Sequence, residues 1–415
     1  MIPTPLAPAA LAACLCLPLV AVAQGLPAPV RSGGEPLTLT AAVALARQHA
    51  PAVGAAQARA LAATAAARAA RQWRGPTLDL SVENLGPQDL DHDAFVWFTQ
   101  PLDIGARRST RVAAAHASRE LLGRAVDAQR RVVDLAVVQT YLDVVRERQV
   151  TALLGGHQHA LSEMVNLVRR RVDEGVAAEG DLRKLEAEQA RTMTARIRAD
   201  LAQRHYGLAL GVLTGEADPA IADRLVPPLP PPVPEADVAA AVERRADIRA
   251  AAALVDQQRA AAAVERALGS TSLAAMGGYK RTSGFNTATA GVSIDLPIGL
   301  RNTPARLRAE AEVVAATLEL EQARAMARLD IDQALLAAQV LNAQAARLDQ
   351  DLVQPALVAQ RAARAAFREG TGDALALVDA DRVHLDSQRE AVTMQLDAVA
   401  ASVRARLALG EDPLP

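Results

Sequence analysis

Residues 77–83 read TLDLSVE, and this segment decides the fold class of the chain. Leu78, Leu80 and Val82 alternate with polar residues, which is the period of a β-strand that is apolar on one face. Residues 94–100 (AFVWFTQ) alternate in a similar way and are the expected partner of this strand. Residues 273–280 and 287–296 repeat the arrangement in the second half. The sequence therefore predicts four strands in two pairs, each with the alternation of a strand that faces lipid on one side.

The scarce aromatic residues gather around these strands. The chain contains two Trp, three Tyr and four Phe, and six of these lie in or beside the four segments: Trp73, Phe95, Trp97, Phe98, Tyr279 and Phe285. This placement is typical of an aromatic girdle at a membrane surface, and the alternative is a soluble sandwich with its large side chains in the core. Four strands are too few to enclose a lumen, because a closed barrel needs about eight. Several copies of the chain must then contribute.

Two very long helices follow the strand pairs, at about residues 105–174 and 302–369. At about 1.5 Å per residue each is on the order of 100 Å long. In the first helix two adjacent apolar seams cover about half of the circumference. They consist of Leu135, Val138, Leu142 and Val145, and of Val137, Tyr141 and Val144. Such a helix needs neighbours on both sides, as in a cylinder wall or a large bundle. Asp134 intrudes on this surface, and Gly155-Gly156 predicts a bend or a close-packing point.

The two halves of the chain resemble one another. Pro101, Gly175 and Gly215 correspond to Pro297, Gly370 and Gly410 with nearly the same shift of about 195 residues, which indicates a tandem duplication. A proline-rich stretch between the halves predicts an extended linker. We therefore divide the chain into residues 1–23, a signal peptide; 24–226, the first repeat; 227–234, the linker; and 235–415, the second repeat.

The N-terminal residues are predicted to be an export signal. The first 23 residues hold no Lys, Arg, Asp or Glu and end in Ala21-Val22-Ala23, which predicts cleavage after Ala23. The alternative is a lipoprotein box at Leu11-Ala12-Ala13-Cys14, which would place a lipid on Cys14. Cys14 and Cys16 are the only cysteines, so a chain cleaved after Ala23 has no disulfide or thiolate metal site.

Composition narrows the function classes. The chain is 51% hydrophobic but only 2% aromatic, and its net charge is −2, which gives no reason to expect a nucleic-acid partner. No later segment has the ~18 uncharged apolar residues of a spanning helix, so a membrane crossing would use strands. We find no phosphate loop, nucleophile elbow or cluster of catalytic carboxylates, and we expect neither a cofactor nor an enzyme.

The order of elements, the duplication and the local motifs resemble the outer-membrane factor (TolC) family. Residues 83–86 (ENLG) and 99–105 (TQPLDIG) are most similar to its CzcC-type branch, which is associated with heavy-metal efflux. The resemblance implies a mainly α-helical fold with a small β part. Three chains would form a twelve-stranded β-barrel in the outer membrane of a Gram-negative bacterium and an α-helical barrel through the periplasm. It also implies a periplasmic adaptor and an inner-membrane RND-type pump as partners.

The resemblance further places the periplasmic gate at two hairpin tips, near Gly175 and Gly370. Family motifs match Gly175, Val176 and Asp181 at the first tip. At the second, Thr371 follows the glycine and Asp379 matches a constriction residue. Three copies would then form carboxylate rings that attract cations. The alternatives are a helix-start role for Asp181 and a solvated face for Asp379. Gly372 stands where other members carry Arg, which departs from the family pattern.

Other candidate sites are weaker. His157 and His159 point in opposite directions on a helix and are not expected to chelate one ion. The loop residues Asp89, Asp91, His92 and Asp93 could hold a divalent cation weakly, but a solvated loop is favoured. The sequence therefore favours a passive exit duct for heavy-metal cations. The alternatives are a duct for drugs or secreted polypeptides, and a periplasmic coiled-coil scaffold.

Overall fold

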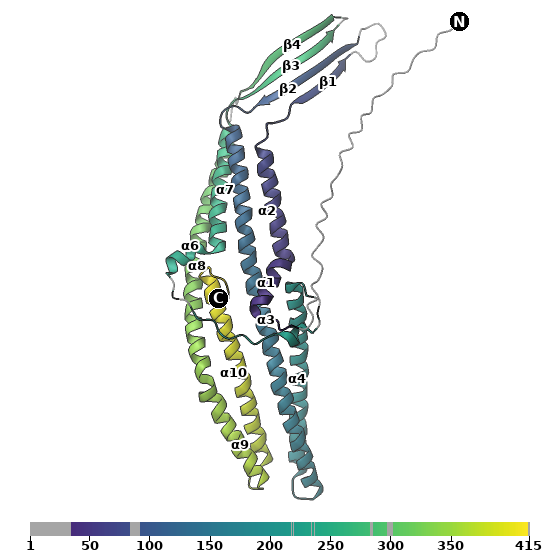
Figure 1. Ribbon diagram of the computed structural model, residues 1–415, viewed down its shortest axis with the longest axis vertical. Helices are drawn as coiled ribbons and strands as arrows, with labels where there is room; N and C mark the ends of the chain where they lie inside the picture. The colour runs from purple at the N-terminus through teal and green to yellow at the C-terminus, as the bar shows by residue number, and fades with distance from the viewer. Residues whose placement is uncertain are drawn as a thin grey trace, which may run out of the picture.

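The computed structural model describes residues 35–83, 92–216, 218, 220–233, 235, 237–282, 285–296 and 302–413. The predicted signal peptide, Cys14, and the loop residues Asp89 and Asp91 lie outside this part of the chain. The molecule is elongated, with one sheet at one end and long helices running away from it (Figure 1). No helix in the described part of the chain is both long and apolar enough to cross a membrane.

The sheet contains the four predicted strands: β1 (Thr77–Glu83), β2 (Asp93–Leu102), β3 (Ser272–Thr282) and β4 (Phe285–Asp295). They are all antiparallel in the order β1-β2-β3-β4. The two halves of the chain therefore meet at the β2–β3 pair, where Val96 lies opposite Tyr279. The β1–β2 and β3–β4 pairs are local, whereas the β2–β3 pair joins segments far apart in sequence.

The register separates the sheet into an apolar and a mixed face. Leu80, Val96 and Tyr279 share the apolar face, because paired residues of antiparallel strands point to the same side. Phe95 and Trp97 fall on the opposite face, so an aromatic girdle on the apolar face would contain Phe98 and Tyr279 but not these two residues. Local packing accounts for this. A Cβ atom at Gly278 would lie 2.5 Å from the ring of Trp97, and the ammonium of Lys280 lies 5.2 Å from the ring centre of Phe95.

The helices occur in the same order in both halves. The first half contains α1 (Leu39–His49), α2 (Pro51–Ala70), α3 (Arg107–Asp173), α4 (Glu179–Thr214) and the short α5 (Ile221–Arg224). The second contains α6 (Val238–Arg244), α7 (Ala246–Leu268), α8 (Thr303–Leu348), α9 (Gln354–Arg368) and α10 (Ala374–Ala408). A π-helical turn, η1 (Asp349–Val353), joins α8 to α9 without a break in the helical backbone. Pro355, the second residue of α9, follows this turn and has no N–H to donate to it.

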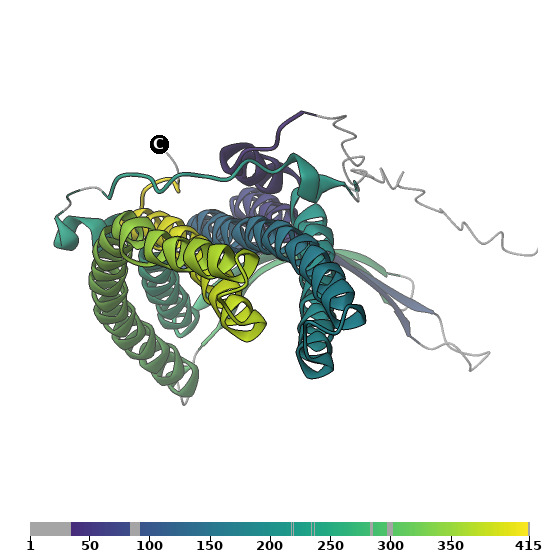
Figure 2. The same ribbon diagram turned by 90° about the horizontal axis from the view of Figure 1, so that it is seen from below.

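The helices pack side by side in a row that is four helices wide. On the sheet side the order is α2, α3, α7 and α8, and on the far side it is α4, α3, α10 and then α8, η1 and α9. The predicted neighbours on both sides of the first long helix are therefore present, because α3 lies inside the row in both halves of its length. Seen from below, α8 and α4 lie toward opposite ends of the row (Figure 2). α3 continues through Gly155 and Gly156, where the side chain of Arg196 packs on Gly155.

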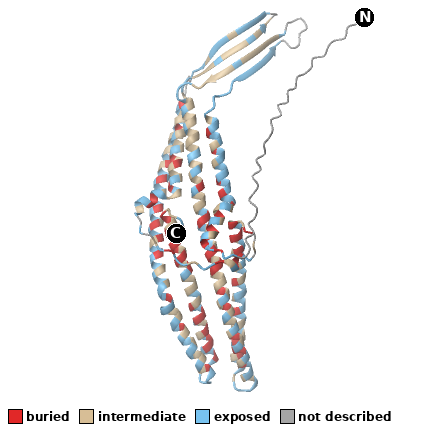
Figure 3. Cartoon of the chain, in the orientation of Figure 1, coloured by how far each residue is buried: buried red, intermediate tan, exposed pale blue. Residues whose placement is uncertain are grey.

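Buried side chains concentrate around the middle of the helical wall (Figure 3). Tyr141 of α3 is fully buried there and ties down the linker. Its hydroxyl lies 2.7 Å from the carbonyl oxygen of Leu37 and accepts a hydrogen bond from the N–H of Val226 at 2.9 Å. Burial raises the pKa of Tyr141 to about 12.

None of the described strand residues is buried, so one chain alone leaves both faces of its sheet uncovered.

Candidate functional site

Two hairpin tips form the end of the wall that lies away from the sheet (Figure 1). The chain turns from α3 into α4 at Gly175 and from α9 into α10 at Gly370, with φ angles of 75° and 78°. The N–H of Val176 donates to the carbonyl of Arg171 at 2.8 Å, and the N–H of Thr371 donates to that of Ala366 at 3.0 Å. Gly175 and Gly370 therefore form left-handed helix C-caps at the two hairpin tips. Glycine fits because it adopts positive φ without a Cβ clash.

The predicted residues of the first tip have local partners. Val176 is 75% exposed directly after the turn. Asp181 lies in the first turn of α4, and its Oδ1 is 3.3 Å from Nζ of Lys184. A carboxylate at this position is favoured by the positive end of the helix dipole. Asp181 therefore occupies a helix-start position, and that position is compatible with a role in a gate.

At the second tip, Thr371 and Asp379 are exposed. The hydroxyl of Thr371 donates to the carbonyl of Ala366 at 3.2 Å, so it closes its own turn. Asp379 lies on α10. The hydrogen bond that Arg382 donates to Glu188 is the largest cause of the raised pKa of Arg382, and the charge of Asp379 adds to it. Within the described residues no ion pair joins the second-tip carboxylate to a residue of the first tip. A carboxylate ring would need several copies of the chain.

Gly372 occupies a position without room for a side chain. A Cβ atom there would lie 2.9 Å from the Cβ of Ala366 and 3.0 Å from the backbone nitrogen of Phe367. The backbone of the preceding turn cannot move away without opening the cap at Gly370. The tight turn thus accounts for glycine at the position where the family resemblance implies Arg.

An ion pair that the sequence did not reveal links the two hairpins just above their tips. Arg382 of α10 donates to both carboxylate oxygens of Glu188 of α4, at 2.6 Å and 3.3 Å. The pair borders a groove of about 330 Å³ whose apolar lining includes Leu185, Leu375 and Val378. The chain holds 45 Lys and Arg and 47 Asp and Glu, so charge alone does not single out this pair. Only the packing of α4 beside α10 does.

The histidines considered above do not converge. His157 is half-buried on α3, whereas the side chain of His159 is 80% exposed and lies 3.5 Å from Glu163. Among the residues that the structure describes, no group of three or more His, Cys, Asp and Glu side chains is placed to hold a metal ion. The expectation that His157 and His159 do not chelate one ion is consistent with this geometry.

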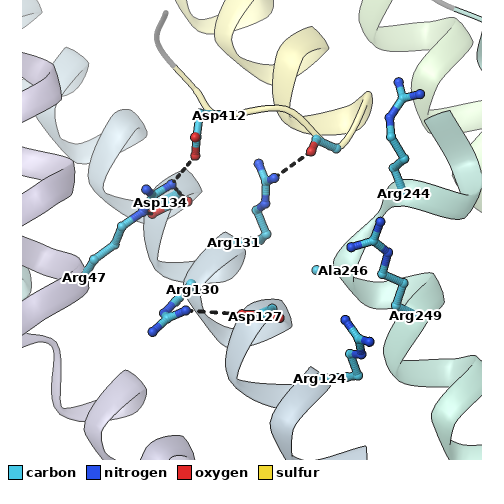
Figure 4. Close-up of a pocket in the computed structure, with 11 residues that line it drawn as sticks. Arg47, Arg124, Asp127, Arg130, Arg131, Asp134, Arg244, Ala246, Arg249 and Asp412 are labelled. Atoms are coloured by element: carbon cyan, nitrogen blue, oxygen red, sulfur yellow. Dashed lines mark hydrogen bonds and ion pairs between the residues drawn. The ribbon is translucent and has the colours of Figure 1, made fainter. Parts of the chain in front are cut away.

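A polar pocket of about 300 Å³ lies at mid-height between α1, α3, α7 and the turn after α10 (Figure 4). It explains the polar residue on the apolar surface of α3. Asp134 is fully buried, and the guanidinium of Arg47 donates to its two oxygens at 2.8 Å and 2.7 Å. Arg47 also contacts Asp412 at 2.9 Å, and the hydrogen bond to Asp134 is the largest cause of its raised pKa. Asp134 is therefore a paired position that anchors α1 and the C-terminal turn to α3.

Known proteins share this sequence pattern and fold. The cobalt-zinc-cadmium resistance protein CzcC of Cupriavidus metallidurans is 28% identical over 393 residues, which cover 90% of this chain and 92% of CzcC. The crystal structure of VceC from Vibrio cholerae has a TM-score of 0.75 at 21% identity, and covers 90% of this chain and 96% of VceC. The open-state MtrE channel of Neisseria gonorrhoeae has a TM-score of 0.76 at 20% identity, and covers 91% of this chain and 89% of MtrE.

A family match covers both halves of the described wall and sheet. Residues 42–216 and 238–411 match the outer membrane efflux protein family, so each repeat-like half is matched separately across its helices and strands. The order of elements, the four-stranded sheet and the paired hairpin tips agree with that match. The chain belongs to the outer membrane efflux protein family.

Proposed function

We propose that three copies of this chain form an outer-membrane efflux channel, a passive exit duct whose cargo is heavy-metal cations. The family match supports the channel, and the name of the CzcC relative supports the cargo. The observation that carries the proposal is the open row of helices. A row four helices wide with two unpartnered edges is a segment of a wall, and copies of it close a cylinder by packing edge to edge.

The two edges carry exposed apolar stripes. On α8 the stripe residues are spaced by four, seven or eleven positions, which places them on one side of the helix. They are 48% to 62% exposed: Leu307, Val314, Leu318, Leu329, Leu336 and Val340 are 56%, 60%, 59%, 48%, 62% and 57% exposed. The other edge carries a matching set on α4, namely Met193, Ile197, Leu201, Leu208 and Val212. Packing one stripe on the other removes both from water.

The sheet has the same need for neighbours. β1 and β4 each pair on one side only, and four strands cannot enclose a lumen. Three sheets joined edge to edge give a twelve-stranded barrel whose apolar face meets the outer-membrane lipid. The helical wall then extends into the periplasm, with its tips toward the inner membrane.

The tips supply a docking surface for a periplasmic adaptor, and through it for an inner-membrane RND-type pump. Val176 is 75% exposed at the first tip, and Leu375 is 50% exposed and lines the groove between α4 and α10. Exposed apolar side chains and an apolar groove suit a partner helix. The partners supply the energy, and we expect no catalytic activity and no resident cofactor in this chain.

Removing the tip carboxylates is expected to weaken cation preference. In the trimer, Asp181→Asn with Asp379→Asn removes six negative charges near the narrow end, and the cation-to-anion permeability ratio should fall by about two- to tenfold. The reversal potential across a planar bilayer under a salt gradient measures this ratio. Asp200→Asn, on α4 away from the tip, is the matched control and should behave like the unmodified channel. An unchanged permeability ratio in the double variant would mean that the tips do not lie on the conduction path.

Growth of a deletion strain tests the cargo. Loss of the gene should lower tolerance to cobalt, zinc and cadmium, and a plasmid copy should restore it, while drug tolerance stays unchanged. Reduced drug tolerance alone would assign the duct to drugs. A purified protein that stays monomeric in detergent and gives no conductance would support a periplasmic scaffold and overturn the channel.

A further inference from the structure

A second groove runs between the two hairpins, closer to the middle of the molecule than the tips. It has a volume of about 690 Å³ and lies between α3, α9 and α10. His157 lines it from α3, Arg364 from α9, and Asp381 and His384 from α10. Four amide side chains complete its polar lining: Gln149, Gln360, Gln388 and Gln395. Two imidazoles and one carboxylate therefore line the same groove.

Two of these groups are buried with unused hydrogen-bonding capacity. Asp381 and His384 are 1% and 8% exposed, and they lie on the same side of α10 because they are three residues apart. Oδ1 of Asp381 accepts from Arg364 at 3.1 Å. Oδ2 of Asp381 and Nδ1 of His384 have no hydrogen-bond partner among the described residues. A buried polar atom without a hydrogen-bond partner destabilises the fold. Such an atom marks a side chain whose protonation can change the packing around it.

Burial dominates the protonation of both histidines. It is the largest influence on the pKa of His157 and of His384, and in both cases it lowers the pKa. The negative charge of Asp381 raises both pKa values, and the charges of Glu188 and Asp386 also raise the pKa of His157. Arg364 lowers both values, and Arg361 lowers that of His384. Both imidazoles are therefore neutral at neutral pH.

We propose that His157, Asp381 and His384 form a proton-sensitive switch that loosens the packing of α3 against α9 and α10 when the pH falls. Protonation adds up to two positive charges to a groove that already holds Arg364. Asp381 is the one carboxylate among the lining residues, and it is already bound to that arginine, so it cannot compensate all three cations. Glu188 and Asp386 lie outside this lining and pair with Arg382 and Arg389. The buried side chains of Asp381 and His384 can be hydrated in the charged state only if the helices that cover them move apart. The π-helical turn η1 directly precedes α9 and offers a place where this hairpin can bend.

The direction of the effect follows from linkage. The ordinary pKa of histidine is 6.5, and both folded values lie below it. The neutral imidazoles therefore contribute their full stabilisation above about pH 6.5, and that stabilisation is lost as the pH falls through the lowered values. The switch acts within one chain, so it holds whether or not the assembled protein conducts.

Hydrogen exchange of the detergent-purified full chain tests the switch. After correction for the intrinsic pH dependence of exchange, amides of α9 and the first half of α10 should exchange about tenfold faster at about pH 5 than at about pH 7.5. Peptides from α7 serve as the internal reference. His157→Gln with His384→Gln should abolish the difference. His159→Gln, two residues away on the exposed side of α3, should leave it intact.

Asp381→Asn provides a second readout. Removing the carboxylate lowers both histidine pKa values further, so the midpoint of the exchange transition should move to lower pH. The proposal is overturned if wild-type α9 and α10 exchange equally at all pH values, or if the double histidine variant keeps the full response. If that variant does not fold, the wild-type titration and the midpoint of Asp381→Asn still decide the matter.

Discussion

A chain carrying Leu201→Asp and Leu208→Asp is expected to remain monomeric in detergent, whereas the unmodified chain is expected to form trimers. These side chains are 67% and 66% exposed on α4, at the open edge of the helical row. In the proposed trimer, α8 of a neighbouring copy covers them. Burying a leucine is worth about 1.5–3 kcal/mol, so losing two weakens each contact by about two to four orders of magnitude. Sedimentation velocity and gel mobility without heating measure the outcome.

The matched control for this variant is Val132→Asp. Val132 is 62% exposed, like the two leucines, but it lies on α3 inside the row and not at an edge. A trimer should therefore survive the control substitution. Equal helical content by circular dichroism shows that the edge variant is folded. A folded edge variant that still sediments as a trimer would place the contacts between copies elsewhere.

Leu80→Lys is expected to prevent stable insertion into the outer membrane. Leu80 is 70% exposed on β1, and the register places it on the apolar face with Val96 and Tyr279. A lysine on the lipid face near the bilayer centre costs about 2–4 kcal/mol, and the trimer carries three of them. The variant should be lost from the outer-membrane fraction of a density gradient and should fold poorly into lipid vesicles.

Ser81→Lys is the control for this prediction. Ser81 is the next residue of the same exposed strand, but it pairs with Phe95 on the opposite face of the sheet. The same charge should be tolerated there because that face turns away from lipid in the proposed barrel. Equal loss of both variants would mean that strand formation, and not the lipid-facing surface, is affected. Normal insertion of Leu80→Lys would place the apolar face away from lipid.

Local patterns predicted much of the fold. The alternation in residues 77–83 predicted β1 with its observed bounds, because this signal depends on neighbouring residues only. The positions of the two tips came from the family resemblance, and both glycines have the positive φ of such a turn. The sheet face on which each aromatic residue lies was harder to predict from the sequence. Phe95 and Trp97 interrupt the alternation of β2, and their side became clear only from pairing with Lys280 and Gly278.

The candidate sites divide in the same way. The position of Asp181 at the start of a helix follows from the sequence around it, while a role in a gate still depends on the proposed trimer. The partner of Asp134 was not predictable, since Arg47 is 87 residues away in the chain. The same holds for Glu188 and Arg382, which are 194 residues apart. Such pairs carry no periodic signal, and the number of charged residues allows many alternatives.

The sequence by itself determined the periodic features of this protein: four strands with an apolar face, two very long helices, two glycine caps and a duplicated order of elements. Each follows from the geometry of a strand or helix over a few residues. Only the tertiary structure decided which helices form the row, which apolar stripes stay open at its edges, and which charged groups meet between the hairpins. Those features depend on contacts between distant segments. Burial and pairing select them from many combinations that the sequence alone permits.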